Sequence, residues 1–134
     1  MKSLDEWNQT WFGVWRETGD AYRKCPSIKE FVSPAVSERY DKHCIAHYLS
    51  SAKIVAATSR IGFPCVVCGT SFTGSISYRT DGRWLWLDDL SHYVQEHNVA
   101  IPTAMLETIQ RHDYEPPDVT DNQVDALEWP PIEA

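Results

Sequence analysis

The dipeptide Asp81-Gly82, within the run "SYRTDGRWLWLDD", constrains the fold of this chain more than any other feature. Asp-Gly between two alternating runs is the strongest local signal for a β-hairpin, because both residues tolerate the positive φ of a type I′ turn. Such a turn predicts a register in which Thr80 opposes Arg83 and Ser77 opposes Trp86. The chain is therefore expected to contain an antiparallel pair of strands centred on this turn.

The predicted hairpin places two tryptophans together. Side chains alternate across a sheet, so Trp84 and Trp86 share the more polar face with Ser77 and Arg79. The opposite face carries Ile76, Tyr78 and Leu85. Adjacent bare tryptophans are unfavourable on a soluble monomer. Either a helix covers them, with the tryptophan-rich first segment as the best candidate, or they form a partner-binding patch.

Signals for helices and one further strand lie on both sides of the hairpin. Apolar periodicity and capping residues predict helices over residues 3–18, 34–50 and 88–97 and from 102 onward, with a strand over residues 53–58. Asp88 is expected to cap the third helix, and Asn98 to end it. Together these elements predict an α+β fold, in which a small antiparallel sheet with a DG hairpin packs against N-terminal and C-terminal helices.

The charge of the chain is concentrated at one end. The 22 residues from Asp113 to Ala134 carry 7 of the 19 acidic side chains and no lysine or arginine. The other 112 residues therefore hold 12 acidic and 12 basic side chains and are formally neutral. We predict one domain over residues 1–112 and an acidic, proline-containing tail over residues 113–134. Such a tail repels nucleic acid and attracts a basic surface, or is a solubilising, partly disordered end.

Cys65 and Cys68 form a CxxC motif followed by glycine, a spacing that brings two thiolates to one metal ion. A complete zinc site needs two more ligands. Cys25, Cys44, His43 and His47 are candidates for these two ligands, but their spacing does not match a second metal-binding motif. His92 and His97 are predicted not to act together, because they lie about 140° apart around a helix. Zinc binding, redox chemistry and plain buried thiols remain alternatives, and we expect no bound metal and no cofactor.

Other enzyme signatures are absent from the sequence. His43 and His47 have the spacing of a metal-binding pair but lack the glutamate of an HExxH motif. Cys44 with a distant histidine is a conceivable nucleophile pair, although any chain rich in both residue types permits one. No glycine-rich phosphate-binding motif and no GxSxG motif occurs, and basic residues are scattered singly. We therefore expect neither an enzyme nor a nucleic-acid-binding protein.

The sequence also bears on cellular location. No apolar run approaches the roughly 18 residues that a membrane-spanning helix requires, so no membrane partner is expected. The N-terminal run "MKSLDEWNQTW" lacks the apolar core of a secretory signal. We expect a cytoplasmic protein with reduced cysteines. The oligomeric state is not predicted.

Three runs of the chain resemble a group of small bacterial proteins. These runs are "AHYLSSAKIVAATS", "FPCVVCG" and "YRTDGRWLWLDDLSHYVQEHNVAIP", which together span about residues 46–110, roughly half the chain. They resemble immunity proteins of contact-dependent growth inhibition systems. The resemblance implies a cytosolic protein that binds and neutralises the toxin domain of a neighbouring or sibling cell. Many such toxins are nucleases with basic clefts, and toxin-facing residues do not transfer between immunity families.

Acidic residues near one aromatic anchor are the expected partner-binding residues, because charge complementarity speeds association and buried aromatics anchor interfaces. They are Asp88, Asp89, Asp118, Asp121, Asp125, Glu128 and Trp129. The main alternative is a small zinc-binding or redox module built on Cys65 and Cys68. A third is a structural or regulatory domain with some other protein partner.

Overall fold

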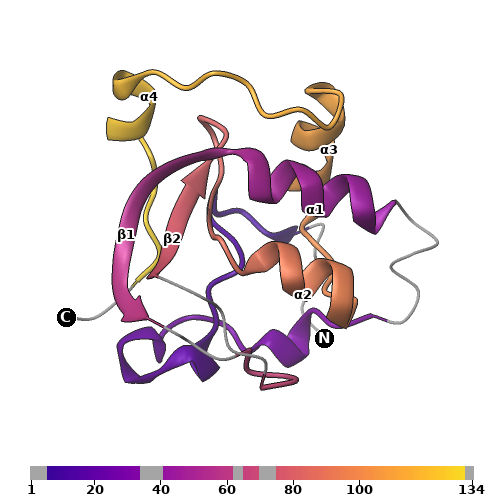
Figure 1. The fold of residues 1–134 in the computed structure, drawn as a ribbon, viewed down its shortest axis with the longest axis vertical. Helices are drawn as coiled ribbons and strands as arrows, with labels where there is room; N and C mark the ends of the chain where they lie inside the picture. Colours follow the sequence, from indigo (N-terminus) through magenta and orange to yellow (C-terminus); the bar gives the residue numbers. More distant parts are fainter. Residues whose placement is uncertain (1–5, 34–40, 62–64, 70–74, 132–134) are drawn as a thin grey trace.

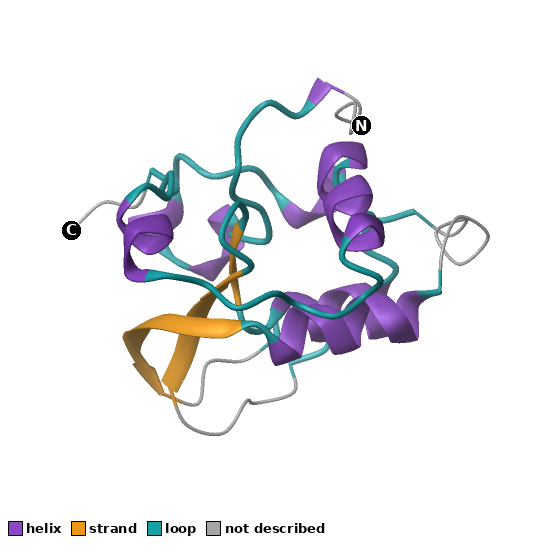
Figure 2. Ribbon diagram, turned by 90° about the horizontal axis from the view of Figure 1, so that it is seen from above, coloured by secondary structure: helices purple, strands orange, loops and turns teal. Residues whose placement is uncertain are grey.

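The fold, seen in a computed structural model, is described for residues 6–33, 41–61, 65–69 and 75–131 of the chain (Figure 1). A three-stranded antiparallel sheet has the order β1-β2-β3, with β1 at Lys53–Ile61, β2 at Ser75–Thr80 and β3 at Leu85–Leu87. The α-helices are α1 (Lys42–Ser51), α2 (Leu90–His97), α3 (Thr103–Arg111) and α4 (Asp121–Asp125). Three short 3₁₀ helices precede them, η2 (Arg16–Thr18), η3 (Asp20–Tyr22) and η4 (Ile28–Glu30). The α+β prediction is confirmed, and Figure 2 shows the strands gathered at one side of the molecule.

The strands that flank Asp81-Gly82 pair as antiparallel neighbours, but in a different register from the predicted one. Thr80 pairs with Leu85 and Arg79 with Trp86, whereas the prediction placed Thr80 opposite Arg83. The register is therefore shifted by two residues. Because side chains alternate with a period of two, this shift leaves the predicted faces of the two strands unchanged.

The connection between β2 and β3 is wider than a two-residue turn because the Asp81 side chain organises it. The Asp81 carboxylate accepts the backbone N–H groups of Arg83 at 3.0 Å and Trp84 at 2.8 Å. Gly82 has a left-handed φ of 96°, and Asp81 does not have a positive φ. The predicted type I′ turn, which needs positive φ at both central residues, was therefore wrong.

Helices α1 and α3 cover the two tryptophans of the hairpin, which are buried. The Trp86 ring stacks on Tyr48 of α1, and its indole N–H donates to the Leu49 carbonyl at 3.0 Å. The Trp84 indole N–H donates to the Thr108 hydroxyl of α3 at 3.3 Å. The tryptophans are thus core residues rather than a partner-binding patch. The N-terminal segment does not cover them as a helix, but its Phe12 and Trp15 pack in the same core as both tryptophans.

The N-terminal segment is extended rather than helical over residues 7–15, and only the short 3₁₀ helix η2 follows within the predicted range. The Phe12 N–H donates to the Leu85 carbonyl at 2.9 Å, and the Leu85 N–H donates to the Thr10 carbonyl at 2.9 Å, so this segment runs along β3. Gly13 has a left-handed φ of 83°, and a Cβ there would meet Leu90 Cδ2 at 2.9 Å. The helix predicted over residues 3–18 was therefore wrong, although its capping serine lies outside the described residues.

This extended segment completes a second core on the face of the sheet opposite the two tryptophans. The core consists of Trp11, Val14, Tyr22, Cys25, Tyr78, Leu85 and Leu87. The larger core lies on the tryptophan face and includes residues of α1, α2 and α3. Each face of the small sheet therefore contributes to a buried core, although Ile54 of β1 remains exposed.

Helix boundaries follow capping chemistry. Helix α1 begins after Asp41, whose carboxylate accepts the His43 N–H at 2.9 Å. The predicted start at Pro34 lies outside the described residues. Helix α2 ends at Asn98 as predicted, because Asn98 adopts the left-handed conformation with φ 54°. Its N-cap is Asp89 rather than Asp88.

The C-terminal residues 113–131, here called the acidic strap, pack against the body of the protein. The strap runs from α3 through α4 and returns beside β2 (Figure 1). The Thr10 N–H donates to the Glu128 carboxylate at 2.8 Å, and the Lys53 ammonium donates to the Val119 carbonyl at 3.2 Å. The Trp129 ring meets Tyr78 edge-on at 5.0 Å between centroids. These contacts fix the position of the strap.

Candidate functional site

The acidic strap displays its carboxylates to solvent. Six acidic residues of the strap are exposed: Asp113, Glu115, Asp118, Asp121, Asp125 and Glu128. The strap contains no lysine or arginine. Lys53 comes within 3.9 Å of Asp121, but the Asp121 side chain is fully exposed, so this ion pair offsets little of the charge. The strap is a fixed surface of high negative charge density.

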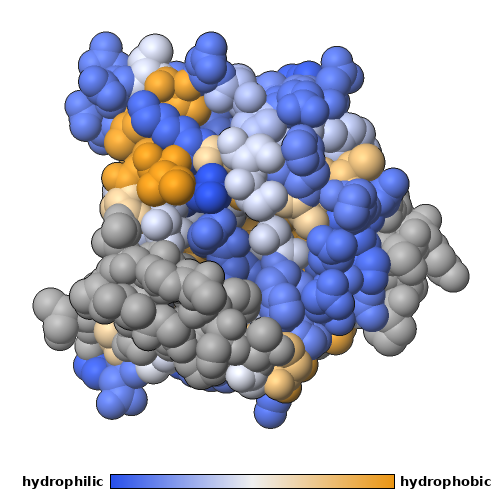
Figure 3. All heavy atoms as spheres, viewed as in Figure 1, coloured by the Kyte–Doolittle hydropathy of each residue, from blue (hydrophilic) through white to orange (hydrophobic). Residues whose placement is uncertain are grey.

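Apolar side chains accompany this negative charge. Trp129, at 45% exposure, is one of the large hydrophobic residues that remain accessible, and Ile54 of β1 is another at 53%. Figure 3 shows a largely hydrophilic face on which hydrophobic side chains gather over the region of α4 and β1. Strap residues also help to line a hollow of about 490 Å³ with Ser51 and Lys53. Apolar side chains beside charged ones are typical of protein interfaces.

The two acidic residues predicted to bind a partner at the start of α2, Asp88 and Asp89, do lie there but have other roles. Asp88 accepts from the Arg79 guanidinium at 2.6 Å. Asp89 is buried with only 6% of its surface exposed, and its Oδ1 has no hydrogen-bond partner within the described part of the chain. Burial, with the negative charge of Asp88, raises the pKa of Asp89 to about 7. Asp89 therefore cannot present a carboxylate to a partner.

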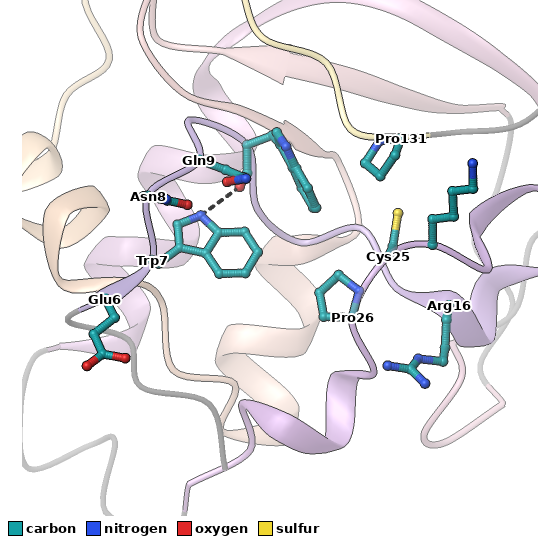
Figure 4. A pocket seen from close by; sticks show the side chains of 10 residues that line it. Glu6, Trp7, Asn8, Gln9, Arg16, Cys25, Pro26 and Pro131 are labelled. Atoms are coloured by element: carbon teal, nitrogen blue, oxygen red, sulfur yellow. Dashed lines mark hydrogen bonds between the residues drawn. The ribbon is translucent and has the colours of Figure 1, made fainter.

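A second hollow, of about 420 Å³, lies near the N-terminal segment (Figure 4). Trp7 and Gln9 lie on one side of it, and Pro26, Cys25 and Arg16 lie on the other. The Trp7 indole N–H donates to the Trp11 carbonyl at 3.0 Å, and Arg16 lies 3.8 Å from the Glu30 carboxylate. The Trp7 and Arg16 side chains thus help to hold the fold, whereas the buried Oε1 of Gln9 has no hydrogen-bond partner within the described residues.

The structure does bring together two thiols and two imidazoles. Cys65 and Cys68 come from the loop at residues 65–69, and His92 and His97 come from α2. One donor atom of each residue lies within 4.8 Å of the others, so this group could hold a metal ion. The other sequence candidates do not join it, since Cys25 belongs to the second core and Cys44, His43 and His47 lie on α1.

The prediction that His92 and His97 do not act together was wrong. Their ring centroids are 5.0 Å apart. His97 is the last residue of α2, and the loop that carries Cys65 packs at this end, so the two imidazoles converge on it. An angle around the helix axis describes the Cα–Cβ direction alone, whereas an imidazole nitrogen reaches well beyond Cβ.

A sequence signal for this pairing was present. The four residues have the spacing C-x₂-C-x₂₃-H-x₄-H. Cys₂His₂ zinc sites commonly combine C-x₂₋₄-C with H-x₃₋₅-H, and both halves of the motif fall within those limits. The histidine pair was missed because it was judged by its helical angle rather than by its spacing.

A third polar cluster is buried between α1, the hairpin and the end of α3. The Tyr48 hydroxyl donates to the Asp81 carboxylate at 2.6 Å and lies 2.9 Å from His112 Nδ1. Burial and the neighbouring Asp81 carboxylate raise the pKa of Tyr48. Since Asp81 also organises the hairpin connection, this cluster joins α1 to the sheet and has a structural role.

No protein-family model matches the chain, and neither does any curated protein or solved structure. Within the described residues, none of the helices combines the length and apolar character needed to cross a bilayer.

Proposed function

We propose that the protein is a cytoplasmic, non-enzymatic binding protein that neutralises a cognate toxin domain, most simply a nuclease, by direct contact. The observation that carries this proposal is the acidic strap, which the body holds in place with its carboxylates exposed. The resemblance of residues 46–110 to immunity proteins supports the same role.

The distribution of charge suits a basic partner. The first 112 residues are formally neutral, and residues 113–134 carry the whole net charge of −7, with six of the seven acidic side chains in the strap. The negative charge is therefore concentrated on one part of the protein. A surface of this kind steers a basic partner during diffusion and raises the association rate. If the strap occupies the basic cleft of a nuclease toxin, its fixed carboxylates would block the path of the nucleic acid's phosphate backbone.

The strap also offers apolar anchors for a complex. Trp129 is an accessible residue of the strap itself. Ile54 is also accessible and follows Lys53, which contacts the strap. Aromatic residues are enriched among the side chains that contribute most to binding free energy. Because contacts with Thr10, Lys53 and Tyr78 already hold the strap, little conformational entropy is lost on binding.

The direct test mixes the purified protein with the toxin domain encoded immediately upstream of its gene. We expect a stable one-to-one complex by calorimetry, loss of toxin activity in the complex, and protection of cells that express both proteins. If no complex forms and the cells are not protected, the proposal is wrong.

A charge variant tests the role of the strap within that complex. The triple variant Asp118→Asn, Asp121→Asn and Asp125→Asn should lower the association rate constant on the order of tenfold and weaken its dependence on salt. The matched control also removes three exposed acids, all outside the strap, by changing Asp20 to asparagine and Glu96 and Glu107 to glutamine. An equal effect of the control would show that net charge matters and the strap surface does not.

A further inference from the structure

We propose that Cys65, Cys68, His92 and His97 form a structural zinc site that ties the loop at residues 65–69 to helix α2. The site is separate from the strap, and the inference does not depend on the proposed function. The juxtaposition that carries it is a pair of thiols from a tight loop facing a pair of imidazoles from one helix.

The distances between donor atoms match those of a tetrahedral zinc ion. With Zn–S bonds of about 2.3 Å and Zn–N bonds of about 2.0–2.1 Å, a sulfur and a nitrogen on one ion lie about 3.6 Å apart. Cys65 Sγ lies 3.4 Å from His97 Nε2, and Cys68 Sγ lies 3.6 Å from His92 Nε2. All four donor atoms lie within 4.8 Å of one another, so a small contraction completes the tetrahedron.

The loop directs two of its backbone N–H groups at the sulfur of Cys65. The backbone N–H groups of Val67 and Cys68 both donate to Cys65 Sγ at 3.4 Å. A neutral thiol is a weak acceptor, whereas a metal-bound thiolate uses such hydrogen bonds to disperse its charge. The Gly69 N–H donates to the Cys65 carbonyl at 3.0 Å, and Gly69 has a left-handed φ of 75°. Glycine after the second cysteine is therefore required by the backbone of this turn.

The helix side of the site is equally fixed. The Val66 N–H donates to the Tyr93 hydroxyl at 3.0 Å, which holds the loop against α2 beside His92. Asn98 ends α2 in the left-handed conformation directly after His97. The loop is thus positioned by a hydrogen bond that is independent of any ion, and the four donors converge within this frame.

The donor set favours zinc and a structural role. Two thiolates with two imidazoles in a tetrahedron are the ligands that Zn²⁺ prefers over Mg²⁺, Ca²⁺ or Mn²⁺. Four protein ligands fill the coordination shell, which leaves no open position for water or substrate. Cys65 is buried and Cys68 is exposed, so the ion is bound at the edge of the core. It would cross-link a loop to a helix across the 23 residues that lie between Cys68 and His92.

The first measurement is the metal content of protein purified under reducing conditions without chelator. We expect about one zinc ion per chain. Replacement by Co²⁺ should give the strong visible bands of tetrahedral cobalt and near-ultraviolet thiolate-to-cobalt charge transfer. Chelation should lower the midpoint of thermal unfolding, because a bound metal stabilises the folded state.

Variants then assign the ligands. Cys68→Ser and His92→Gln change accessible side chains, so both should fold, lose the metal and lose the response to chelator. The matched controls Cys44→Ser and His43→Gln alter the thiol and imidazole of α1 and should keep one metal ion per chain.

Three results would overturn the inference. In the first, the wild-type protein binds neither zinc nor cobalt. In the second, the Cys68→Ser and His92→Gln variants both retain the metal. In the third, the metal-free protein has a mass lower by two hydrogens, which shows a Cys65–Cys68 disulfide. None of these measurements uses the toxin, so failure here leaves the proposed function standing, and the converse also holds.

Discussion

Replacement of the buried Asp89 by asparagine should change how the stability of the protein depends on pH. Asp89 is 6% exposed, and its Oδ1 lacks a hydrogen-bond partner in the described part of the chain. Desolvation by burial, with the charge of Asp88, raises the pKa of Asp89 from 3.8 to about 7. The folded protein therefore binds the proton more tightly than the unfolded chain does.

The sign and size of the effect follow from proton linkage. The contribution of Asp89 to the free energy of unfolding is fully present below pH 3.8, where Asp89 is protonated in both the folded and the unfolded state. This contribution is lost as the pH rises through the folded-state pKa of about 7. A pKa that is higher by about 3 units corresponds to about 4 kcal/mol, at about 1.4 kcal/mol per unit. Of this, about 3 kcal/mol should be lost between about pH 5 and pH 8. Asparagine has no such proton, so the variant should not lose this stability.

Urea unfolding at intervals from pH 5 to 8 measures the effect as the difference in unfolding free energy between wild type and Asp89→Asn. The lowered pKa values of Glu17 and Asp41 make stability rise with pH, which is opposite to the effect of Asp89. Because both proteins contain these two residues, their effects cancel in the difference. The exposed substitution Asp118→Asn is the control and should give a flat difference. A flat difference for Asp89→Asn, within about 1 kcal/mol, would refute the reasoning.

Two further substitutions test the fold. Gly13→Ala should destabilise by at least about 1 kcal/mol in urea unfolding, because Gly13 is left-handed and packs against Leu90; stabilisation would instead support a helix. Tyr48→Phe should cost about 2 kcal/mol in the same assay, because the buried Asp81 carboxylate loses a donor. Tyr114→Phe, which removes a weak 3.4 Å contact, is the control for Tyr48→Phe, and an equal loss would contradict a special role for the Asp81 contact.

The hairpin shows how far local signals reach. Asp-Gly located the turn, and alternation assigned the faces of Arg79 and Trp86, because faces depend on parity alone. The register was beyond local rules, since it depends on the Asp81 side chain, which accepts two backbone N–H groups and also binds Tyr48 of α1. A contact with a distant helix thus takes part in setting the length of the connection.

The N-terminal segment shows why helical periodicity failed. Its aromatic residues recur at helical spacing, but they divide between two cores, since Trp11 packs in the second core and Phe12 and Trp15 pack in the larger one. An extended chain between two layers sends neighbouring side chains to opposite sides, and Gly13 adopts a conformation that a helix excludes. A pattern of apolar residues cannot distinguish one buried face from two.

In the thiol–imidazole cluster, the spacing of the cysteines and histidines along the sequence was a better guide to their grouping than the helix predicted around the histidines. The helix predicted around His92 and His97 was confirmed, and its ideal geometry argued against a shared ligand. The two imidazoles meet the thiols at the loop of residues 65–69, which the Tyr93 hydroxyl in the middle of α2 holds against the helix. A metal-binding motif depends on where four donors converge in space, so a helical angle taken from one element is a poor reason to reject it. Spacing that matches both halves of a known motif should outweigh that angle.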